Sequence, residues 1–503
     1  MIDYSFIEDL KKIPTGIKGF EHLSNGGLTQ NRTTLVCGTS GAGKTLFVIE
    51  ILYRGITQYN RPGIFVTFEE RPKAIVQNVK SLNWGLVKLI KEKKLMFVDA
   101  SPEPDPVLEI GEYDLSGLLI QIKEAIKEIN AEIVVMDSIG ALFGQFTNTQ
   151  LIRTEMLRIT EELKKCGVTT VITAERLEEY GTISRHGIEE FLSDNVIVLR
   201  NVLEEEKCRR TIQILKVRGD THIQGEFPFI ISSTGFNIMS LTAIELIQTS
   251  SLKKVSTGNK KLDEITNGGI FQDSVFLVSG PTGGGKTLMS TIFASAACKN
   301  NEKTLLLAYE ESREQLLRNA ISWGINFEEW EKKNLLKICC QYPEKMGLEE
   351  HLLVIQKEVA AFKPKRLIMD SISAMERVST TRNFREFVIG LTSFVKQESI
   401  CSLFTSTTPQ LHGGESVTEA HISTITDIIM LLRYVEINGY LRRGISVIKM
   451  RGSQHEKQVF EFTIDAKGLH IGDPFKNVQN IILGFPTSLG PTESEHLGGM
   501  FKD

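Results

Sequence analysis

Two glycine-rich segments in this sequence have the spacing of a phosphate-binding loop. Each reads G-x-x-x-x-G-K-T, follows an apolar run typical of a strand and opens a helical pattern. Glycines let backbone N–H groups converge on phosphate oxygens, the lysine adds positive charge at the outer phosphates, and the threonine hydroxyl reaches Mg²⁺. We predict that these segments bind MgATP through Thr39, Ser40, Gly41, Ala42, Gly43, Lys44 and Thr45, and through Thr282, Gly283, Gly284, Gly285, Lys286 and Thr287.

An aspartate ends a short apolar run downstream of each loop. Asp137 closes the run VVMD and Asp370 closes LIMD. At the end of a buried strand beside a phosphate loop, a carboxylate holds Mg²⁺ through its water shell. A strand-end aspartate is also a common helix cap, and that interpretation stays open. Because the placement occurs twice, we predict that Asp137 and Asp370 hold Mg²⁺ together with Thr45 and Thr287.

Two adjacent glutamates end the strand that follows each phosphate-loop helix. They are Glu69 and Glu70 in the first half and Glu310 and Glu311 in the second. Neighbouring carboxylates repel each other, which raises at least one pKa and suits a general base that takes a proton from an attacking hydroxyl. The alternative is a solvated pair at a helix start that complements the helix dipole.

Two cations two residues apart occur late in each half. Lys216 and Arg218, like Lys449 and Arg451, alternate on a predicted strand and so project to the same face. They lie far along the chain from their own phosphate loop, which indicates that they reach a neighbouring subunit's nucleotide and neutralise charge on the transferred phosphoryl group. The competing interpretation is an exposed strand edge protected by charge.

These residues recur because the sequence is a repeat of itself. Lys44 aligns with Lys286 at an offset of 242 residues, and Asp137 aligns with Asp370 at an offset of 233, which then holds to the end of the repeat. Small deletions therefore separate two copies of one domain. We predict a first domain over residues 1–240, a linker over 241–252, a second domain over 253–472 and an irregular tail over 473–503.

The elements that position these residues alternate in type. Short apolar, β-branched runs such as TTLVCG, GIFVTF and EIVVMD are separated by longer helical patterns in both halves. That order predicts the α/β class, with two tandem P-loop NTPase domains that each contain a largely parallel sheet flanked by helices. Ligands bind such sheets just beyond the ends of the strands, where the glycine clusters lie.

The two halves differ most clearly just before a late strand of each domain. The second half has a cluster of hydroxyls there, and the first half has none. Hydroxyls in that cluster are able to accept phosphate, although surface hydroxyls are more often turn or cap groups. The cluster consists of Thr418, Ser423 and Thr424, which align with Arg185, Glu190 and Phe191.

The composition is typical of a globular protein without affinity for polyanions. Hydrophobic residues make up 41% and charged residues 24%, and the net charge is −4, whereas nucleic-acid binders usually carry a basic face. There is no apolar run long enough to cross a bilayer and no secretory signal. The seven cysteines lack zinc-site spacing and are expected to be reduced and mostly buried. We expect a cytoplasmic protein that associates with neither membranes nor nucleic acid.

Several motifs together resemble the KaiC family, the circadian-clock ATPases and autokinases of cyanobacteria. They are the doubled phosphate loop, both glutamate pairs, KMRGS at 449–453 and especially EAHISTITD at 419–427. The resemblance extends to about residue 472 and implies RecA-like domains stacked as a homohexameric double ring, with ATP at the subunit interfaces of both tiers. The first tier would hydrolyse ATP slowly, and the second would phosphorylate and dephosphorylate adjacent Ser and Thr residues across the interface.

The resemblance also implies roles for individual residues. Ser423 and Thr424 match the family's phosphoacceptors, and Thr418 matches its auxiliary hydroxyl. Glu310 would act as general base toward the acceptor with Glu311 beside it, while the first tier would position water through Glu69 and Glu70. The trans-acting cations would be Lys216, Arg218, Lys449 and Arg451, followed on the same loops by His222 and His455.

The partners implied by the resemblance differ between the two ends of the chain. KaiB docks on the first tier in this family, so a KaiB-like partner is expected on the first domain. The tail, residues 473–503, is only weakly similar to the segment through which family members bind KaiA, so KaiA dependence is doubtful. Because KaiC-like proteins also occur in non-photosynthetic bacteria and archaea, a signalling role is as compatible with the motifs as a clock role.

Two other classes of function compete with a ring-shaped ATPase and autokinase. A DNA-handling motor of the recombinase or helicase type shares this core, but the acidic net charge and the lack of an aromatic, basic groove disfavour it. A ring scaffold that uses ATP only to hold its interfaces would not need two intact glutamate pairs. The hydroxyl cluster and the family resemblance favour the ATPase and autokinase.

Overall fold

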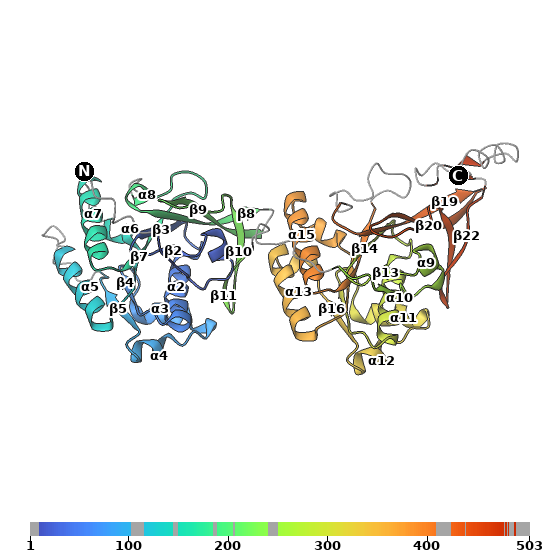
Figure 1. Cartoon of the computed structure of the whole chain (residues 1–503), viewed down its shortest axis with the longest axis horizontal. Coiled ribbons are helices and arrows are strands. Elements are labelled where there is room, and N and C mark those ends of the chain that lie inside the picture. The colour runs from blue at the N-terminus through green and yellow to red at the C-terminus, as the bar shows by residue number, and fades with distance from the viewer. Residues whose placement is uncertain are drawn as a thin grey trace. The chain divides into compact units, whose positions relative to one another are not determined.

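The chain contains two compact units, Met1–Ala243 and Ile244–Asp503. The structure is a computed structural model, shown in Figure 1, and each unit is described by itself. The described residues are 10–101, 115–143, 149–184, 189–204, 207–239, 250–408, 424–437, 439–476, 478–479, 481 and 487–488.

The first unit places strands and helices in alternation over most of its length. Its strands are β1 (Lys12–Ile13), β2 (Leu28–Thr29), β3 (Thr33–Gly38), β4 (Gly63–Thr67), β5 (Leu95–Asp99), β6 (Ile133–Asp137), β7 (Thr169–Glu175), β8 (Asn195–Glu204), β9 (Lys207–Val217), β10 (Phe227–Ser232) and β11 (Gly235–Ile238). Its helices are α1 (Phe20–Leu23), α2 (Lys44–Tyr59), α3 (Pro72–Asn78), α4 (Leu86–Lys91), α5 (Leu115–Ile129), α6 (Ile139–Phe143), α7 (Thr149–Lys165) and α8 (Glu189–Leu192).

The second unit repeats this alternation. Its strands are β12 (Lys254–Val255), β13 (Ile270–Phe271), β14 (Val275–Gly280), β15 (Thr304–Ala308), β16 (Leu336–Cys340), β17 (Arg366–Asp370), β18 (Cys401–Thr407), β19 (Ile428–Ile437), β20 (Tyr440–Met450), β21 (Phe460–Asp465) and β22 (Gly468–Pro474). Its helices are α9 (Lys260–Ile265), α10 (Lys286–Lys299), α11 (Arg313–Ser322), α12 (Phe327–Lys332), α13 (Leu348–Phe362), α14 (Ser373–Glu376) and α15 (Thr381–Gln397). The tail, expected to be irregular, includes one short antiparallel pair, β23 (Val478–Gln479) with β24 (Thr487–Ser488).

Each unit is built on a nine-stranded sheet, and the two sheets have the same strand order. The order is β5-β4-β6-β7-β3-β8-β9-β10-β11 in the first unit and β16-β15-β17-β18-β14-β19-β20-β21-β22 in the second. The first six strands of each are parallel, and the last three extend the sheet in antiparallel fashion. The predicted fold class, two α/β domains with largely parallel sheets, is therefore confirmed.

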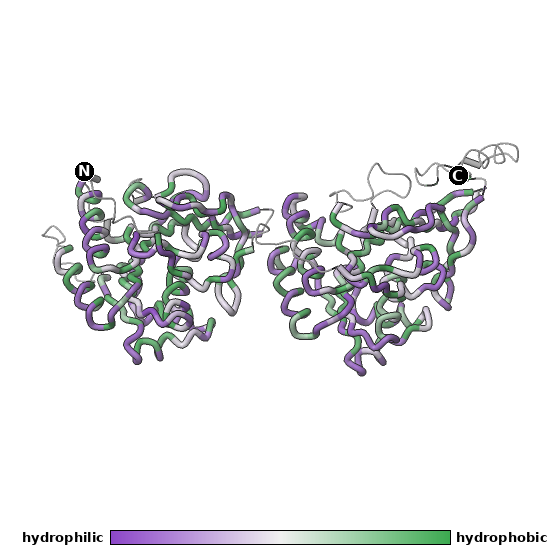
Figure 2. Tube along the Cα trace, viewed as in Figure 1, coloured by the Kyte–Doolittle hydropathy of each residue, from purple (hydrophilic) through white to green (hydrophobic). Residues whose placement is uncertain are grey.

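Helices cover both faces of the first sheet because alternate residues of its central strands are apolar on both sides. On one face, Val36 and Phe65 belong to the core beneath α2, α3 and α4. On the other face, Leu35 and Ile64 belong to the core beneath α5 and α7. Figure 2 shows this as hydrophobic strands in the middle of each unit, with mixed hydropathy along the helices.

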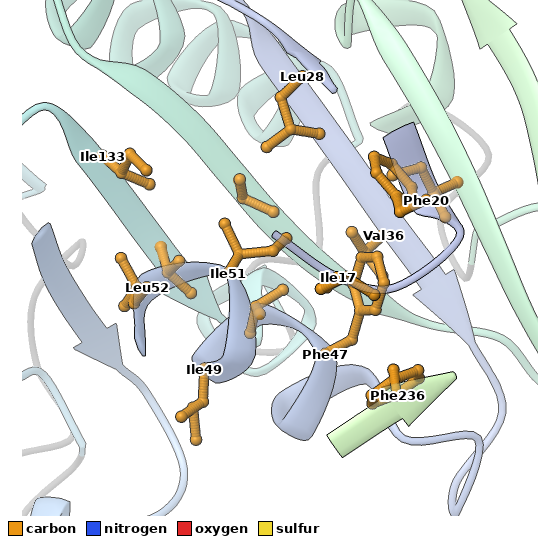
Figure 3. Packing of buried hydrophobic residues seen from close by; sticks show 14 of the residues in the cluster. Ile17, Phe20, Leu28, Val36, Phe47, Ile49, Ile51, Leu52, Ile133 and Phe236 are labelled. Atoms are coloured by element: carbon orange, nitrogen blue, oxygen red, sulfur yellow. The ribbon is translucent and has the colours of Figure 1, made fainter. Parts of the chain in front are cut away.

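The helix that begins at the phosphate loop is held by aromatic packing in the first unit. Phe47 of α2 lies between Phe20 and Phe236, with ring-centroid distances of 5.7 Å and 5.2 Å and edge-on geometry in both pairs (Figure 3). All three rings are buried. Burying such side chains gives up little conformational freedom for a large apolar area, so the start of α2 has a fixed position relative to β3.

Each sheet has two functional edges. Parallel strands end at one edge, so the segments that follow β3, β4 and β6 meet there, and we call this the carboxyl edge. The opposite edge, here the amino edge, holds the start of β8 and the end of β9, because β9 runs antiparallel to β8 and pairs Val217 with Asn195. The second unit has the same two edges around β14 and β19.

The cysteines and the helices test two smaller expectations. Cys37, Cys298 and Cys401 are buried, but Cys166, Cys208 and Cys340 are exposed, so the expectation of mostly buried thiols is wrong for those three. None of the helices in the described part of the chain combines the length and apolar character that crossing a bilayer requires.

Candidate functional site

Both phosphate loops lie at the carboxyl edge, between the central strand of the sheet and the helix that follows it. Lys44 folds back over its loop, and its Nζ donates hydrogen bonds of 3.0 Å to the carbonyl oxygens of Gly38 and Thr39. Lys286 Nζ makes the same two contacts in the second loop, at 2.9 Å. Each loop leads directly into α2 or α10, and the free N–H groups at the start of such a helix favour binding of an anion in the loop.

Glycine is required immediately before each lysine. Gly43 and Gly285 have φ angles of 95° and 100°, a left-handed conformation that L side chains rarely adopt. A Cβ atom on Gly43 would lie 3.1 Å from Ile231, and one on Gly285 would lie 3.1 Å from Ile464. The motif glycines therefore allow the loop to lie against the antiparallel part of the sheet.

Carboxylates surround each loop lysine. Burial lowers the pKa of Lys44 and of Lys286, and negative charges nearby act in the opposite direction. For Lys286 these charges are Asp370 and Glu310. For Lys44 they are Glu175, Asp137 and Glu69. The predicted magnesium and base residues of each half therefore lie close enough to the predicted phosphate-binding lysine to act on its charge.

The strand-end aspartates are held by hydroxyls from the neighbouring strand. Thr173 on β7 donates to Asp137, and Thr405 on β18 donates to Asp370 at 2.5 Å. Burial raises the pKa of Asp370, whereas hydrogen bonds from Thr405 and Thr287 and the charge of Lys286 lower it. The Thr287 contact places the loop threonine beside the carboxylate, as a shared magnesium site requires.

The two glutamates of each pair face different ways. Glu69 and Glu310 are the members that interact with the loop lysines. Their neighbours turn toward the following helix, where Asn78 Nδ2 donates to Glu70 Oε2 at 3.0 Å and Asn319 Nδ2 donates to Glu311 Oε2 at 3.1 Å. The sequence singled out the pairs but did not separate their members.

The pKa of one pair member departs from its usual value for a reason that sequence analysis did not give. The pKa of Glu311 is raised chiefly by burial and then by the charge of Asp370, while the charge of Glu310 contributes less. Mutual repulsion within the pair, the cause that the sequence suggested, is therefore a minor one at Glu311.

The carboxylates that face the lysines have different partners in the two units. Glu69 Oε1 accepts a hydrogen bond of 2.8 Å from Ser138 Oγ. Glu310 Oε1 instead lies 2.8 Å from Arg377 Nη2. Ser371, the counterpart of Ser138, is fully buried, and its hydroxyl has no hydrogen-bond partner among the described residues. The base candidate of the second unit is thus paired with a cation that the first unit's candidate does not contact.

The late cations lie at the amino edge of each sheet, away from their own phosphate loop. Lys216 Nζ donates to the carbonyl oxygens of Glu190 and Ser193, at 3.0 Å and 2.7 Å. Lys449 Nζ donates to Thr426 O at 2.7 Å. Arg218 and Arg451 directly follow β9 and β20, and both side chains are more than half exposed.

The predicted acceptor segment meets the arginine of its own chain at this edge. Arg451 Nη2 donates to Thr424 O at 2.7 Å. Asp427, three residues further along, accepts a hydrogen bond from the N–H of Val275, the first residue of β14. The phosphate loop follows the other end of β14, and six residues of extended strand place the two ends roughly 16 Å apart. Thr424 therefore lies a full strand length from its own loop.

The remaining predicted residues are placed as follows. His222 and His455 are partly buried and lie in the segments just beyond Arg218 and Arg451. Ser423 and Thr418 lie outside the described residues, as does Arg185 of the first unit. Glu190 and Phe191, which align with Ser423 and Thr424, belong to the short helix α8, and Phe191 is exposed.

Comparisons with known proteins assign both halves to one family. The KaiC ATPase family matches residues 13–243 and again residues 255–476. The chain is 52% identical over 494 residues to the circadian clock oscillator protein KaiC of Thermostichus vulcanus, covering 98% of this chain and 95% of that protein. It is 50% identical over 505 residues to the circadian clock protein KaiC3 of Synechocystis sp., covering both chains completely, and 51% identical over 493 residues to the KaiC of Synechococcus elongatus, covering 98% and 95%.

This chain belongs to the KaiC family. Membership implies ATP binding, and the residues of both loops fit a triphosphate. Each KaiC-type loop presents helix N-terminal N–H groups, a partly or fully buried lysine whose amino group contacts loop carbonyls, and a glycine at a place where a Cβ would crowd the sheet.

The donor set also fits magnesium. Among the described residues no group of three or more His, Cys, Asp or Glu side chains is arranged to hold a metal by itself. Mg²⁺ usually takes one or two carboxylates and completes its shell with water and substrate phosphates. One aspartate and one threonine hydroxyl per site, as with Asp370 and Thr287, match that preference.

Sequence reasoning missed several residues that border this KaiC-type site. Three kinds of contact were overlooked. They are hydroxyls that donate to the strand-end aspartates or to Glu69, asparagine amides that donate to the second glutamate of each pair, and carboxylates beside the loop or the cations. The alignment of the two halves carried a signal for most of them, because they occupy equivalent positions in the two halves. They are Thr173 and Thr405, Asn78 and Asn319, Ser138, Asp194 and Asp427, and, in the first unit alone, Glu175 and Glu179, whose carboxylate accepts from the Thr39 hydroxyl.

Proposed function

We propose that this KaiC-family chain is an ATP-hydrolysing homohexameric ring whose second domain is a Ser/Thr autokinase and autophosphatase. The placement of the acceptor segment is the observation that carries the proposal. Thr424 lies at the amino edge beside Arg451, whereas Lys286 and Glu310 lie at the carboxyl edge of the same sheet. A nucleotide on the Lys286 loop therefore needs the acceptor of another subunit.

The transfer in the second domain uses residues from two subunits. The hydroxyl oxygen of Ser423 or Thr424 attacks the γ-phosphorus, the new oxygen–phosphorus bond forms, and the bond to the bridging oxygen breaks and releases ADP. Glu310 of the nucleotide-binding subunit takes the hydroxyl proton, because it is the pair member that faces the loop lysine. Arg451 and Lys449 come from the acceptor's own subunit and neutralise charge on the transferred group.

Hydrolysis in the first domain follows the same plan with water as the nucleophile. Glu69 takes a proton from water, and the products are ADP and phosphate. Lys216 and Arg218 of the neighbouring subunit supply the positive charge. Mg²⁺, when held by Asp137 with Thr45 and by Asp370 with Thr287, offsets negative charge on the outer phosphates.

The wider role follows from the relatives. The three relatives named above are circadian clock proteins, which supports a clock or signalling role in which the phosphorylation state changes affinity for a partner. A KaiB-like protein on the first domain is the partner that we propose. Binding of purified KaiB to the chain, measured with and without ATP, tests that part of the proposal.

Phosphate mapping tests the autokinase assignment. The purified chain is incubated with γ-labelled ATP and Mg²⁺, and modified residues are mapped by mass spectrometry. We expect label on Ser423 and Thr424, and none on those peptides in Ser423→Ala/Thr424→Ala. Equal labelling of the double variant at other residues would refute the acceptor assignment, and a wild-type chain that takes up no nucleotide would refute the whole proposal.

A further inference from the structure

One aspartate in each unit lies between the late cations and the strand that leads to the phosphate loop. In the second unit it is Asp427, whose side chain is only 15% exposed. Its Oδ2 accepts a hydrogen bond of 2.9 Å from the N–H of Val275, and its Oδ1 accepts one of 2.8 Å from Lys396 Nζ. Arg451 Nη1 lies 3.7 Å from the same Oδ1, and Arg451 N donates to Asp427 O at 3.0 Å.

The first unit contains the same arrangement around Asp194. Its side chain is 14% exposed, its Oδ1 accepts from Arg32 Nη1 at 2.9 Å, and Arg218 Nη1 lies 3.5 Å from that oxygen. Arg218 N donates to Asp194 O at 3.0 Å. The N–H of Thr33, the first residue of β3, lies 3.4 Å from Asp194 Oδ2.

What recurs in the two units is the carboxylate and its arginine. The second cation differs in type and origin, because Arg32 precedes β3 whereas Lys396 belongs to α15. The shared contacts connect the start of the central strand to the arginine that directly follows β9 or β20.

The charges around Asp427 indicate a role for its carboxylate. An exposed arginine has many rotamers, and its lysine neighbour two residues away repels it. Burial and then the Arg451 charge lower the pKa of Lys449, while Asp427 opposes that effect. A partly buried carboxylate thus offsets the repulsion and restricts Arg451, which also donates to Thr424 O at 2.7 Å.

We propose that Asp194 and Asp427 are positioning residues that hold Arg218 and Arg451 in place to act on the neighbouring subunit's nucleotide. The inference rests on the proposed function. In the second unit, Asp427 also fixes the arginine relative to the acceptor segment. Each aspartate also accepts from the N–H of Thr33 or Val275, the first residue of the strand that leads to the phosphate loop. It therefore connects its arginine to the phosphate-loop strand of the same subunit.

Asp427→Asn is the informative substitution, because asparagine keeps an oxygen acceptor for the Val275 N–H but lacks the charge that holds Arg451. We expect the rate of Ser423 and Thr424 phosphorylation at saturating MgATP to fall about tenfold or more, as misplacement of a catalytic group predicts. The MgATP concentration for half-maximal rate should change about twofold or less, since the phosphate loop is untouched. Lys396→Met, which removes the other cation, is the matched control and should keep the rate within about twofold.

A double-mutant cycle separates positioning from a general structural role. If Asp427 acts through Arg451, then Asp427→Asn/Arg451→Ala should be no slower than Arg451→Ala alone. A full additional tenfold loss in the double variant would overturn the inference, and so would an unchanged rate in Asp427→Asn. Assembly and thermal unfolding of each variant are measured alongside.

The first unit provides a second route if Asp427→Asn does not fold. Asp194→Asn should lower ATP hydrolysis by the full chain severalfold and should have no further effect on Arg218→Ala. Unchanged hydrolysis would overturn the inference. A wild-type chain without phosphorylation or hydrolysis would instead refute the proposed function, so the two failures are distinguishable.

Discussion

The two units have the same strand order and the same loop, aspartate and glutamate pair, but they hold the candidate base differently. In the first unit, Glu69 accepts a hydrogen bond from Ser138. In the second, Glu310 pairs with Arg377, and the buried hydroxyl of Ser371 has no partner among the residues described. The comparison shows that the fold sets the position of a reactive carboxylate, while a residue beyond the motif sets what it contacts.

The difference fits the two proposed reactions. Among the described residues, Glu69 accepts only a hydroxyl hydrogen bond from Ser138, which leaves its other carboxylate oxygen open to a water molecule. Glu310 is contacted by the Arg377 guanidinium at 2.8 Å, so an incoming hydroxyl must compete with the arginine for this carboxylate. The second unit would then hydrolyse less ATP and transfer more phosphate to an acceptor hydroxyl, provided that docking of the acceptor releases Glu310 from Arg377.

The largest expected effect comes from neutralising the lysine-facing glutamates. Glu310→Gln should lower acceptor phosphorylation by roughly 10²-fold or more, and Glu69→Gln should lower ATP hydrolysis in the first domain by a similar factor, because general-base catalysis contributes about that much. Quantitative mass spectrometry and ADP release measure the two reactions. Retained phosphorylation in Glu310→Gln would show that Glu310 is not the base.

A smaller effect is expected for the other member of each pair. Glu70 and Glu311 accept hydrogen bonds from Asn78 and Asn319 on the following helix. Glu311→Gln should therefore lower phosphorylation by only about tenfold, because the charge-assisted hydrogen bond from Asn319 becomes a weaker neutral one while the base is untouched. If Glu311→Gln were slower than Glu310→Gln, the assignment of roles within the pair would be reversed.

Removing the arginine should make the second unit resemble the first. Arg377→Ala should raise the second domain's ATP hydrolysis about threefold to fivefold, since an ion pair this exposed contributes less than about 1 kcal/mol. ADP release in the Ser423→Ala/Thr424→Ala background measures this without phosphotransfer. Arg382→Ala, an exposed arginine of α15 that pairs with Glu386, is the matched control. A fall in hydrolysis would contradict the proposed restraint.

The serines should show the smallest and most unequal effect. Ser138→Ala removes the hydrogen bond to Glu69 and should lower first-domain hydrolysis about twofold to fivefold. A loss of this size is expected for a single hydrogen bond from a hydroxyl to a carboxylate. Ser371→Ala removes a hydroxyl that contacts no hydrogen-bond partner in the described part of the chain and should change the resting rate less than twofold, about the limit of measurement. Equal losses in the two units would mean that Glu310 already uses Ser371 during turnover.

Local patterns predicted most of the candidate site because each of its motifs is a short, continuous stretch of sequence. The phosphate loops, Asp137 and Asp370, and the glutamate pairs each follow a strand, and parallel strands end at one edge, so spacing alone indicated that they meet. The cations were singled out by their distance along the chain from the loops, and the structure places them at the amino edge.

What the sequence did not predict depends on side-chain direction and on contacts between distant elements. The difference in role that we propose between Glu310 and Glu311 depends on which one turns toward Asn319 on α11. Arg377 lies outside every motif and reaches Glu310 across the carboxyl edge. Asp427 was visible in the repeat of the two halves, but its role appears only when Val275, Lys396 and Arg451 converge on it.

A mixing experiment tests the trans arrangement most directly. Lys286→Ala removes the phosphate-loop lysine of the second domain but keeps the acceptors, whereas Ser423→Ala/Thr424→Ala keeps the loop but lacks them. Neither variant alone should be labelled at positions 423 and 424. After subunits are mixed and reassembled with γ-labelled ATP, we predict label on Ser423 and Thr424 of the Lys286→Ala chain. Absence of that label, from mixed rings whose composition native mass spectrometry verifies, would contradict transfer between subunits.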